Sequence, residues 1–352
     1  MMTACLDAID EPAPDAVDPE PPSAAAPQWF ELPDLGLIAV DGPDAADFLQ
    51  GQITSDIREL AADRTHLSSH CSHRGRVLAI FRLLRLDGVI HLLLPRERIP
   101  DLLKRLRMFV LRSRVTLADV SDRLHCLGLA GVGAPALLEA RGLPVPAAAD
   151  ELAVDPAGPT GLAVLRLPGA APRFMLLVPD AAPNPPRTWL AAGAPPADPA
   201  AWTLLDIQAG LPWVYESTAD TFVPQMLNLD LLGAISFRKG CYTGQEVVAR
   251  LRYLGKLKRR LHVAEVASER APRPGDELYA PESQSSQASG WVVETAPLGV
   301  GRHALLVVAE IAAAASGGVR LGENGPWLRL EPPPQGLDDD SGAAALDEAG
   351  SR

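Results

Sequence analysis

The sequence predicts an α+β protein that ends in a small all-β unit. Between residues 35 and 210, short apolar runs that read as strands alternate with segments whose apolar residues recur at helical spacing. From residue 261 onward only short apolar runs remain, divided by glycine and proline, a pattern typical of a small β-barrel. The chain has 352 residues and is 47% apolar, so it can bury a large core and is long enough for two or three domains.

A series of strand, helix and hairpin is predicted in the first third of the chain. The hairpin rests on Asp87-Gly88, because this dipeptide between two apolar runs is a strong turn signal. Pro43 offers a start for the first helix, and apolar side chains recur at helical spacing in the second. The predicted strands are 35–42, 77–86 and 89–94, and the predicted helices are 44–52 and 99–110.

A second series of strand, helix and hairpin follows. A later helix, 198–210, is well defined, with Asp198 as N-cap, Pro199 at the first helical position and Gly210 just past its end. The other predicted elements are strand 124–132, helix 134–142, strands 161–167 and 173–179, and the carboxy-terminal runs 261–266, 276–280, 290–295, 303–311, 319–322 and 327–332.

The formal charge of -12 lies mostly in the two ends of the chain. Residues 1–28 hold six acids and no Lys or Arg, and residues 333–352 hold five acids against Arg352, which leaves the body of the chain at -2. Both ends are rich in Pro, Ala, Asp and Ser and show no apolar period, so we expect them to be disordered. The global charge therefore excludes few classes of ligand.

Neither a membrane anchor nor a disulfide framework is predicted. No basic segment precedes an apolar one near the first residues, and the most apolar run, 304–315, is too short for a bilayer and contains Glu310. The four cysteines are widely separated and form no CxxC pair, which favours reduced thiols. We therefore expect a cytoplasmic protein without a membrane partner.

The stretch FRKGCYTGQEVVAR, residues 237–250, predicts a helix start. Thr243 and Glu246 have the spacing of a capping box, and an apolar face follows at Val247, Val248, Leu251 and Leu254. We therefore expect a helix from Thr243.

Cys241 lies just before this predicted helix. The exposed amides of a helix start, together with Arg238 and Lys239, would favour the thiolate, and Gly240 and Gly244 would allow a ligand to approach the backbone closely. The alternative is a small buried apolar residue at a tight turn, as free cysteines often are. The cap, the cations and the glycines together favour a functional thiol.

At this segment the sequence resembles the YgfZ family of folate-binding, tRNA-modifying proteins, relatives of the aminomethyltransferase (T-protein) of the glycine cleavage system. The motif KGCYTGQE, residues 239–246, matches the signature of that family in full, and it is highly specific. Further matches are FLQGQITSDI at 48–57, HCSHRGRV at 70–77, AWTLLDIQAGLP at 201–212 and FVPQMLNLD at 222–230.

The resemblance implies a T-protein-like fold, with interleaved ferredoxin-like lobes around a central folate cavity over residues 29–250 and a carboxy-terminal β-barrel over residues 251–332. It also implies tetrahydrofolate as the cofactor and a role in maintaining iron–sulfur client enzymes, including those that modify tRNA. Cys241 is then the reactive residue at the cavity, and the folate-binding candidates are Trp202, Gln208, Asn228, Lys239, Tyr242 and Gln245.

Some positions depart from the related patterns. The aminomethyltransferases carry an acidic pair where this chain has Ala79 and Ile80, which argues against the alternative function, folate-dependent aminomethyl transfer. The helix that usually ends EAG ends here with Gln208, so a pterin-facing carboxylate becomes an amide. Leu35 replaces one of the two tryptophans associated with folate, whereas Trp202 matches the other and either stacks on a pterin or fills the core.

Three further hypotheses stay open at this stage. His66, His70, Cys71 and His73 are suitable metal ligands but lack a second ligand pair, so we expect no metal. The basic run 250–260 would suit RNA phosphate or the folate glutamate tail, although it carries no aromatic platform and also reads as a solvated linker. A cysteine hydrolase would need a histidine partner, and no histidine has a context that identifies it as one.

Overall fold

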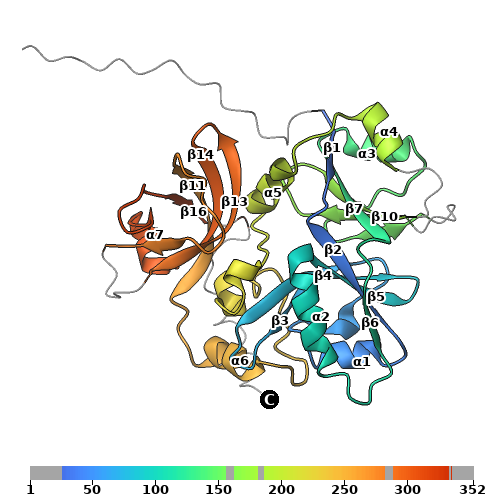
Figure 1. Ribbon diagram of the computed structural model, residues 1–352, viewed down its shortest axis with the longest axis horizontal. Helices are drawn as coiled ribbons and strands as arrows, with labels where there is room; N and C mark the ends of the chain where they lie inside the picture. The colour runs from blue at the N-terminus through green and yellow to red at the C-terminus, as the bar shows by residue number, and fades with distance from the viewer. Residues whose placement is uncertain (1–25, 156–161, 181–185, 282–287, 333, 335–352) are drawn as a thin grey trace, which may run out of the picture.

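Three antiparallel sheets make up the protein, whose computed structural model describes residues 26–155, 162–180, 186–281, 288–332 and 334 (Figure 1). Most of the two ends predicted to be disordered lies outside these residues, but Gln28 already belongs to the first strand. No helix within the described ranges has both the length and the apolar character needed to span a membrane.

The first lobe is a five-stranded sheet of order β3-β4-β5-β2-β6 with helices α1 and α2 on one face. The predicted hairpin is confirmed: β4 and β5 pair directly, and Asp87 and Gly88 have the positive φ angles of 49° and 83° that such a tight turn uses. The bounds are β2 Leu35–Asp41, α1 Ala45–Gln50, η2 Ile57–Glu59, β3 His66–Cys71, β4 Val77–Leu86, β5 Val89–Pro95, η3 Arg96–Arg98, α2 Ile99–Arg107 and β6 Thr116–Asp119.

The second lobe is a five-stranded sheet of order β1-β7-β10-β9-β8. Strand β1 precedes β2 in the chain but pairs with β7, so the two lobes are interleaved from their first strands (Figure 1). The bounds are β1 Gln28–Glu31, β7 Leu124–Ala130, α3 Ala134–Glu139, β8 Leu152–Val154, β9 Ala163–Leu167, β10 Arg173–Pro179, α4 Pro186–Gly193 and α5 Pro199–Gln208. Helix α5 begins as predicted, with the Asp198 carboxylate accepting from the Ala200 amide.

The predicted carboxy-terminal barrel is a six-stranded sheet of order β15-β12-β13-β14-β11-β16 that curls into a half-barrel (Figure 1). Its strands are short except for β11, β13 and β14, and a short helix that the sequence pattern did not reveal follows β14. The bounds are β11 Arg259–Ala267, β12 Glu277–Tyr279, β13 Gly290–Gly299, β14 Arg302–Glu310, α7 Ile311–Ser316, β15 Arg320–Leu321 and β16 Arg329–Glu331.

A long connection, residues 209–258, leads from α5 to this sheet and returns to the first lobe on the way. Its backbone bonds to that lobe at Phe222 O, which accepts from Val77 N at 2.8 Å, and at Ser236 N, which donates to Thr54 O at 2.9 Å. Its regular parts are η4 Glu216–Thr218, η5 Pro224–Leu227 and α6 Gln245–Tyr253. One core cluster contains residues of this connection, of β4 and of β13 and β14. The first lobe, the connection and the half-barrel therefore share a core.

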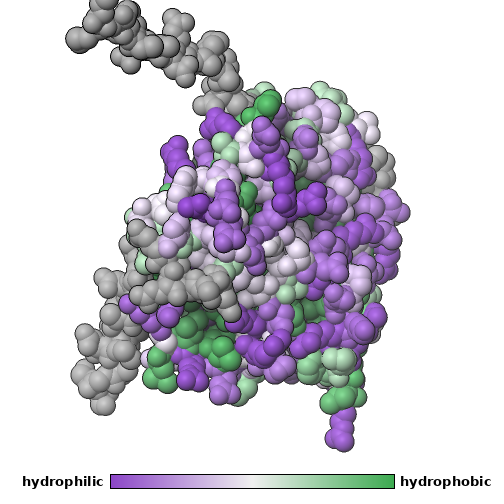
Figure 2. Space-filling model, turned by 60° about the vertical axis from the view of Figure 1, so that its left-hand side comes forward, coloured by the Kyte–Doolittle hydropathy of each residue, from purple (hydrophilic) through white to green (hydrophobic). Residues whose placement is uncertain are grey.

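Polar residues cover most of the face shown in Figure 2, with smaller hydrophobic groups between them. Such scattered apolar surface is normal for a globular protein. The figure therefore gives no sign of a single extended apolar face on this side.

A buried ion pair joins the connection to the half-barrel. Both guanidinium nitrogens of Arg260 in β11 contact Asp230, at 2.9 and 3.0 Å, and only 11% and 9% of these two side chains are exposed. Asn228 adds to this junction, because it donates to Leu261 O at 3.1 Å and accepts from Arg260 at 3.3 Å. The junction is thus held by charge-assisted hydrogen bonds that are largely buried from solvent.

We expect Asp230→Asn to lower the free energy of unfolding by about 3 kcal/mol, because it leaves the Arg260 charge buried without its counterion. Urea denaturation would measure this. The control is Glu331→Gln, which breaks the exposed pair with Arg329 and should change stability by less than about 0.5 kcal/mol. Equal losses in the two variants would contradict the assignment.

Candidate functional site

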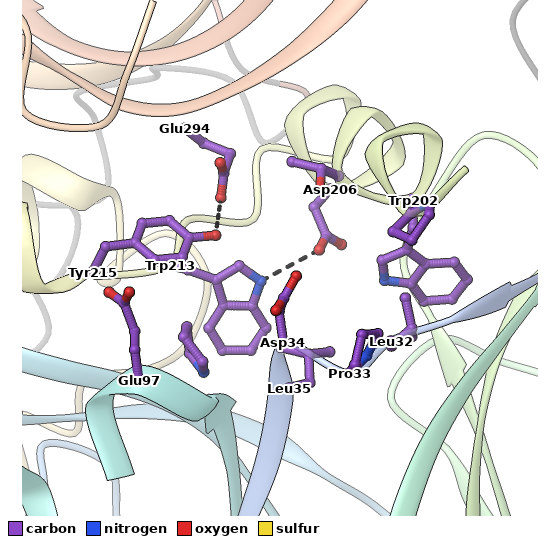
Figure 3. A pocket seen from close by; sticks show the side chains of 13 residues that line it. Leu32, Pro33, Asp34, Leu35, Glu97, Trp202, Asp206, Trp213, Tyr215 and Glu294 are labelled. Carbon is purple, nitrogen blue, oxygen red and sulfur yellow. Dashed lines mark hydrogen bonds between the residues drawn. The ribbon is translucent and has the colours of Figure 1, made fainter. Parts of the chain in front are cut away.

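A cavity of about 330 Å³ lies where the two lobes meet the half-barrel (Figure 3). Side chains reach it from the β1–β2 linker, from the end of β5 and η3, from α5, from the connection and from β13. They are Leu32, Pro33, Asp34, Leu35, Pro95, Glu97, Pro199, Trp202, Thr203, Asp206, Trp213, Tyr215 and Glu294. Its size is that of a small-molecule site.

Trp202 forms one wall of the cavity and is 3% exposed. Its ring packs on Phe30, with ring centroids 5.4 Å apart, and over Gly128, where an added Cβ would lie 2.6 Å from ring carbons. The Arg173 guanidinium lies 5.4 Å from the ring centroid. The indole N–H is buried and has no acceptor among the described residues, so what this wall presents to the cavity is a fixed aromatic side chain.

Asp206, one helical turn after Trp202 on the same face of α5, brings a buried carboxylate to the cavity (Figure 3). One of its oxygens lies 2.8 Å from Arg173 Nη1, and the other accepts from Trp213 Nε1 at 3.3 Å. Burial lowers the pKa of Arg173, and the Asp206 charge opposes that effect. The ion pair therefore holds a buried carboxylate, a hydrogen-bond acceptor, in the cavity wall.

Glu294 of β13 faces the cavity from the half-barrel (Figure 3). It accepts from the Tyr215 hydroxyl and, at 3.0 Å, from the Thr295 amide. Burial raises the pKa of Glu294 to about 7, and burial also raises the pKa of Tyr215. This carboxyl can therefore gain or lose a proton near neutral pH.

The cavity is acidic as well as apolar. Asp34 and Glu97 join Asp206 and Glu294 on its wall, and among the described residues no Lys, Arg or His lines it. Carboxylates accept hydrogen bonds, and the leucine, proline and tryptophan side chains cover flat apolar surface. The cavity therefore favours a planar ligand that carries N–H donors over an anion.

Cys241 lies on an exposed loop and does not line the cavity. The sequence placed Cys241 at a folate cavity, whereas its thiol lies outside the lining of this one. Lys239 does not turn toward the thiol either, because its Nζ donates to Ile53 O at 2.8 Å and to Ser55 O at 2.7 Å and lies 5.2 Å from the Tyr242 ring centroid. Burial lowers the pKa of Lys239 to about 8.

The helix after Cys241 begins at Gln245, so the predicted capping box from Thr243 is wrong. Its N-cap is Gly244, with φ of 84° and no side-chain cap. A Cβ on Gly244 would lie 2.5 Å from Ser72 O, so the loop packs tightly against the end of β3, and the chain needs glycine there. The Thr243 amide donates to Gly51 O at 3.3 Å instead.

The remaining predicted folate ligands are also spread over the molecule. Gln208 is exposed and Asn228 belongs to the half-barrel junction. Tyr242 is buried under Lys239, and Gln245 is half-buried at the start of α6. Of the predicted set, only Trp202 lines the cavity, and Leu35 lines it too.

Four carboxylates that sequence reasoning missed line the cavity, and two of them, Asp206 and Glu294, are buried. Asp206 follows Trp202 by four residues in a helix, so helical spacing was a usable signal for it. Glu294 and Tyr215 are 79 residues apart, and no local pattern joins them.

Two of the histidines considered as metal ligands, His66 and His70, are hydrogen-bonded to neighbouring parts of the first lobe. His70 Nδ1 lies 2.7 Å from Gln52 O, and His66 Nε2 lies 3.1 Å from Ser55 Oγ. Burial lowers the pKa of each to about 4. Within the described ranges, no three His, Cys, Asp or Glu side chains group as metal ligands.

The basic run 250–260 does not form one open cationic face. Arg260 is buried with Asp230, and Arg259 contacts Glu310 at 3.1 Å. Arg252 lies 4.6 Å from the ring centroid of Phe237. Much of its charge is therefore used to attach the half-barrel and to cover apolar rings.

The interleaved lobes, the central cavity and the half-barrel define a protein of the aminomethyltransferase fold. The fold is similar to that of the glycine cleavage system aminomethyltransferase T from Bartonella henselae, with a TM-score of 0.71 over 89% of this chain and 87% of that one. The two sequences are 18% identical, so this likeness shows the fold alone.

Curated relatives identify the family. Two proteins named tRNA-modifying protein YgfZ, from Klebsiella pneumoniae (strain 342) and Escherichia coli O6:H1, are 33% and 31% identical over 88% of this chain and 93% of their own length. A third, from Colwellia psychrerythraea, is 36% identical over 68% of this chain and 73% of its own. No family model matches the chain. The chain belongs to the YgfZ family.

The raised pKa of Glu294 predicts a pH-dependent stability. A carboxyl whose pKa is higher in the folded than in the unfolded protein stabilises the fold at low pH, and this contribution is lost as the pH rises from about 4.5 through 7. The free energy of unfolding of Glu294→Gln, compared with that of the wild type, should therefore be about 2 kcal/mol more favourable at pH 8 than at pH 5.

Urea denaturation of both proteins at the two pH values would measure this difference. Glu265→Gln, in the same sheet and partly exposed, is the control and should follow the wild type. A constant difference between Glu294→Gln and wild type across this range would refute the assignment.

Proposed function

We propose that this protein is a folate-binding accessory protein of the cytoplasm that supports the assembly, maintenance or repair of iron–sulfur enzymes, including enzymes that modify tRNA. The relatives named tRNA-modifying proteins and the complete signature around Cys241 support this role. The observation that carries the folate part is the pairing of Trp202 with the buried carboxylate of Asp206 in one cavity.

The cavity fits a pterin by its donor set. A pterin is a flat heteroaromatic ring whose edge carries adjacent N–H donors, and carboxylates bind such an edge well. Asp206 supplies an acceptor, and the Trp202 ring offers a flat apolar surface. Tetrahydrofolate, when bound, would supply a reduced ring able to carry a one-carbon unit.

Two departures from the family pattern lose much of their weight in this geometry. Gln208 is exposed, so its amide does not replace a carboxylate in the cavity, and Asp206 provides one on the inner face of the same helix. Leu35 fills the position of a tryptophan with another apolar side chain on the wall. The folate proposal therefore depends on Trp202 and Asp206.

The exposed thiol suits a different task. Cys241 is accessible at the surface, so an iron–sulfur client enzyme can reach it while the cavity is filled. In this proposal folate binds in the central cavity, and the client enzyme binds at the loop of residues 237–244.

Aminomethyl transfer remains the second candidate. Ala79 and Ile80 are buried in β4, so no carboxylate stands at the position of the acidic pair. Glu294 favours the candidate, because burial raises its pKa to about 7 and it faces the cavity, as general acid–base catalysis requires. Formation of methylenetetrahydrofolate from an aminomethyl donor would identify this activity.

We expect Trp202→Ala to weaken tetrahydrofolate binding about tenfold, because stacking of a heterocycle on an aromatic side chain contributes about 1–3 kcal/mol and about 1.4 kcal/mol is a factor of ten. Calorimetric titration would measure the affinity. The control is Trp327→Ala, since Trp327 is 54% exposed and lies outside the cavity. Unchanged affinity in Trp202→Ala would remove the pterin from this cavity, and no binding to wild type would end the folate proposal.

Cys241→Ala should bind tetrahydrofolate with the affinity of the wild type and fail to restore iron–sulfur enzyme activity in a strain that lacks the protein. Complementation by Cys126→Ala, which removes a buried thiol, controls for general effects of cysteine loss. Full restoration by Cys241→Ala would exclude a chemical role for the exposed thiol.

A further inference from the structure

A second cavity, of about 270 Å³, lies between α2 and the start of β4. Its wall consists of Leu78, Arg98, Asp101, Leu102, Lys104, Arg105 and Met108. It shares no lining residue with the acidic central cavity, and three cations against one carboxylate give it the opposite sign of charge.

Arg98 is built into this wall. Only 5% of the residue is exposed, and its two terminal nitrogens donate to Asp101 at 3.1 Å and to Leu78 O at 3.4 Å. Its Nε–H is buried and has no acceptor among the described residues. Arg98 is thus held in the wall with part of its guanidinium lacking the partner that buried polar groups nearly always have.

Arg105, near the end of α2, repeats this observation. Its Nε–H is likewise buried without an acceptor in the described part of the chain. Lys104 is exposed and also lines the cavity. Two guanidinium groups and one ammonium therefore line one cavity, and among its described lining residues Asp101 is the single carboxylate.

We propose that this cavity binds a phosphate group. Guanidinium groups bind phosphate oxygens through paired, charge-assisted hydrogen bonds, and lysine adds a point charge. The apolar side chains of Leu78, Leu102 and Met108 leave room for the group that carries the phosphate.

The source of the phosphate is either the backbone of an RNA or a small phosphorylated molecule. The surface after α2 favours RNA, because Arg112 is exposed there together with Phe109 and with Leu111, which is 85% exposed. Exposed cations next to an aromatic ring are typical of single-strand binding surfaces. The basic run 250–260, by contrast, uses Arg259 and Arg260 inside the protein.

The test compares Lys104→Gln/Arg105→Gln with Arg112→Gln, which removes one exposed charge outside the cavity. Thermal unfolding is followed while inorganic phosphate replaces chloride at constant ionic strength. We expect phosphate to raise the unfolding midpoint of the wild type and of Arg112→Gln but not that of the double variant. Asp101→Asn should enlarge the phosphate-dependent rise of the unfolding midpoint, because it removes the one negative charge among the described residues of the wall. A wild type without a phosphate-specific rise, or a double variant that keeps it, overturns the proposal.

Binding of an in vitro transcribed tRNA, measured by fluorescence anisotropy over a salt series, separates the two sources. An RNA source predicts about tenfold weaker binding and a salt slope smaller by about one per lost contact in the double variant. Loss of the phosphate response with unchanged RNA affinity assigns the cavity to a small phosphorylated molecule. Neither result depends on the central cavity, so the folate proposal and this one can fail separately.

Discussion

The buried ion pair between Arg173 and Asp206 is the interaction on which the central site depends. Arg173 is 1% exposed and Asp206 6% exposed, and 2.8 Å separate their nearest atoms. The guanidinium also faces the Trp202 ring, and the carboxylate accepts from Trp213. Removal of either charge leaves the other buried and uncompensated, which costs far more than the pair contributes over an apolar replacement. The sheet of the second lobe, helix α5 and the connection are thus joined at the cavity wall.

This constraint explains the character of the cavity. Arg173 stays behind Asp206 and does not line the cavity, so the open space faces carboxylates and apolar rings. Glu294 completes the wall from the half-barrel, and its bond from Tyr215 links that sheet to the connection. The site forms only when both lobes and the half-barrel are assembled, so ligand binding should stabilise the whole chain by linkage.

Local signals in the sequence predicted local structure well and the site only in part. The Asp198 cap and the Asp87-Gly88 turn appear as predicted, because caps and tight turns depend on neighbouring residues. Position in a motif does not give the face of a helix. Gln208 is exposed and lies outside the cavity lining, whereas the four-residue spacing from Trp202 points Asp206 inward. The helix start predicted at Thr243 is wrong because the real start, after Gly244, is set by packing of Gly244 against Ser72, which lies 172 residues away in the chain. No local pattern reveals such a contact.

The signature segment is held against the first lobe on both sides of Cys241. Lys239 is fixed by two carbonyls of the first lobe and by the Tyr242 ring, and Gly244 allows the backbone to pack on Ser72 where any side chain would collide. These contacts fix both sides of Cys241 and leave its thiol exposed. A buried lysine that gives its hydrogens to carbonyls holds a loop in place and is poorly placed to stabilise a thiolate. The motif therefore holds an exposed thiol on a loop that is fixed at both sides, and Lys239 serves this positioning.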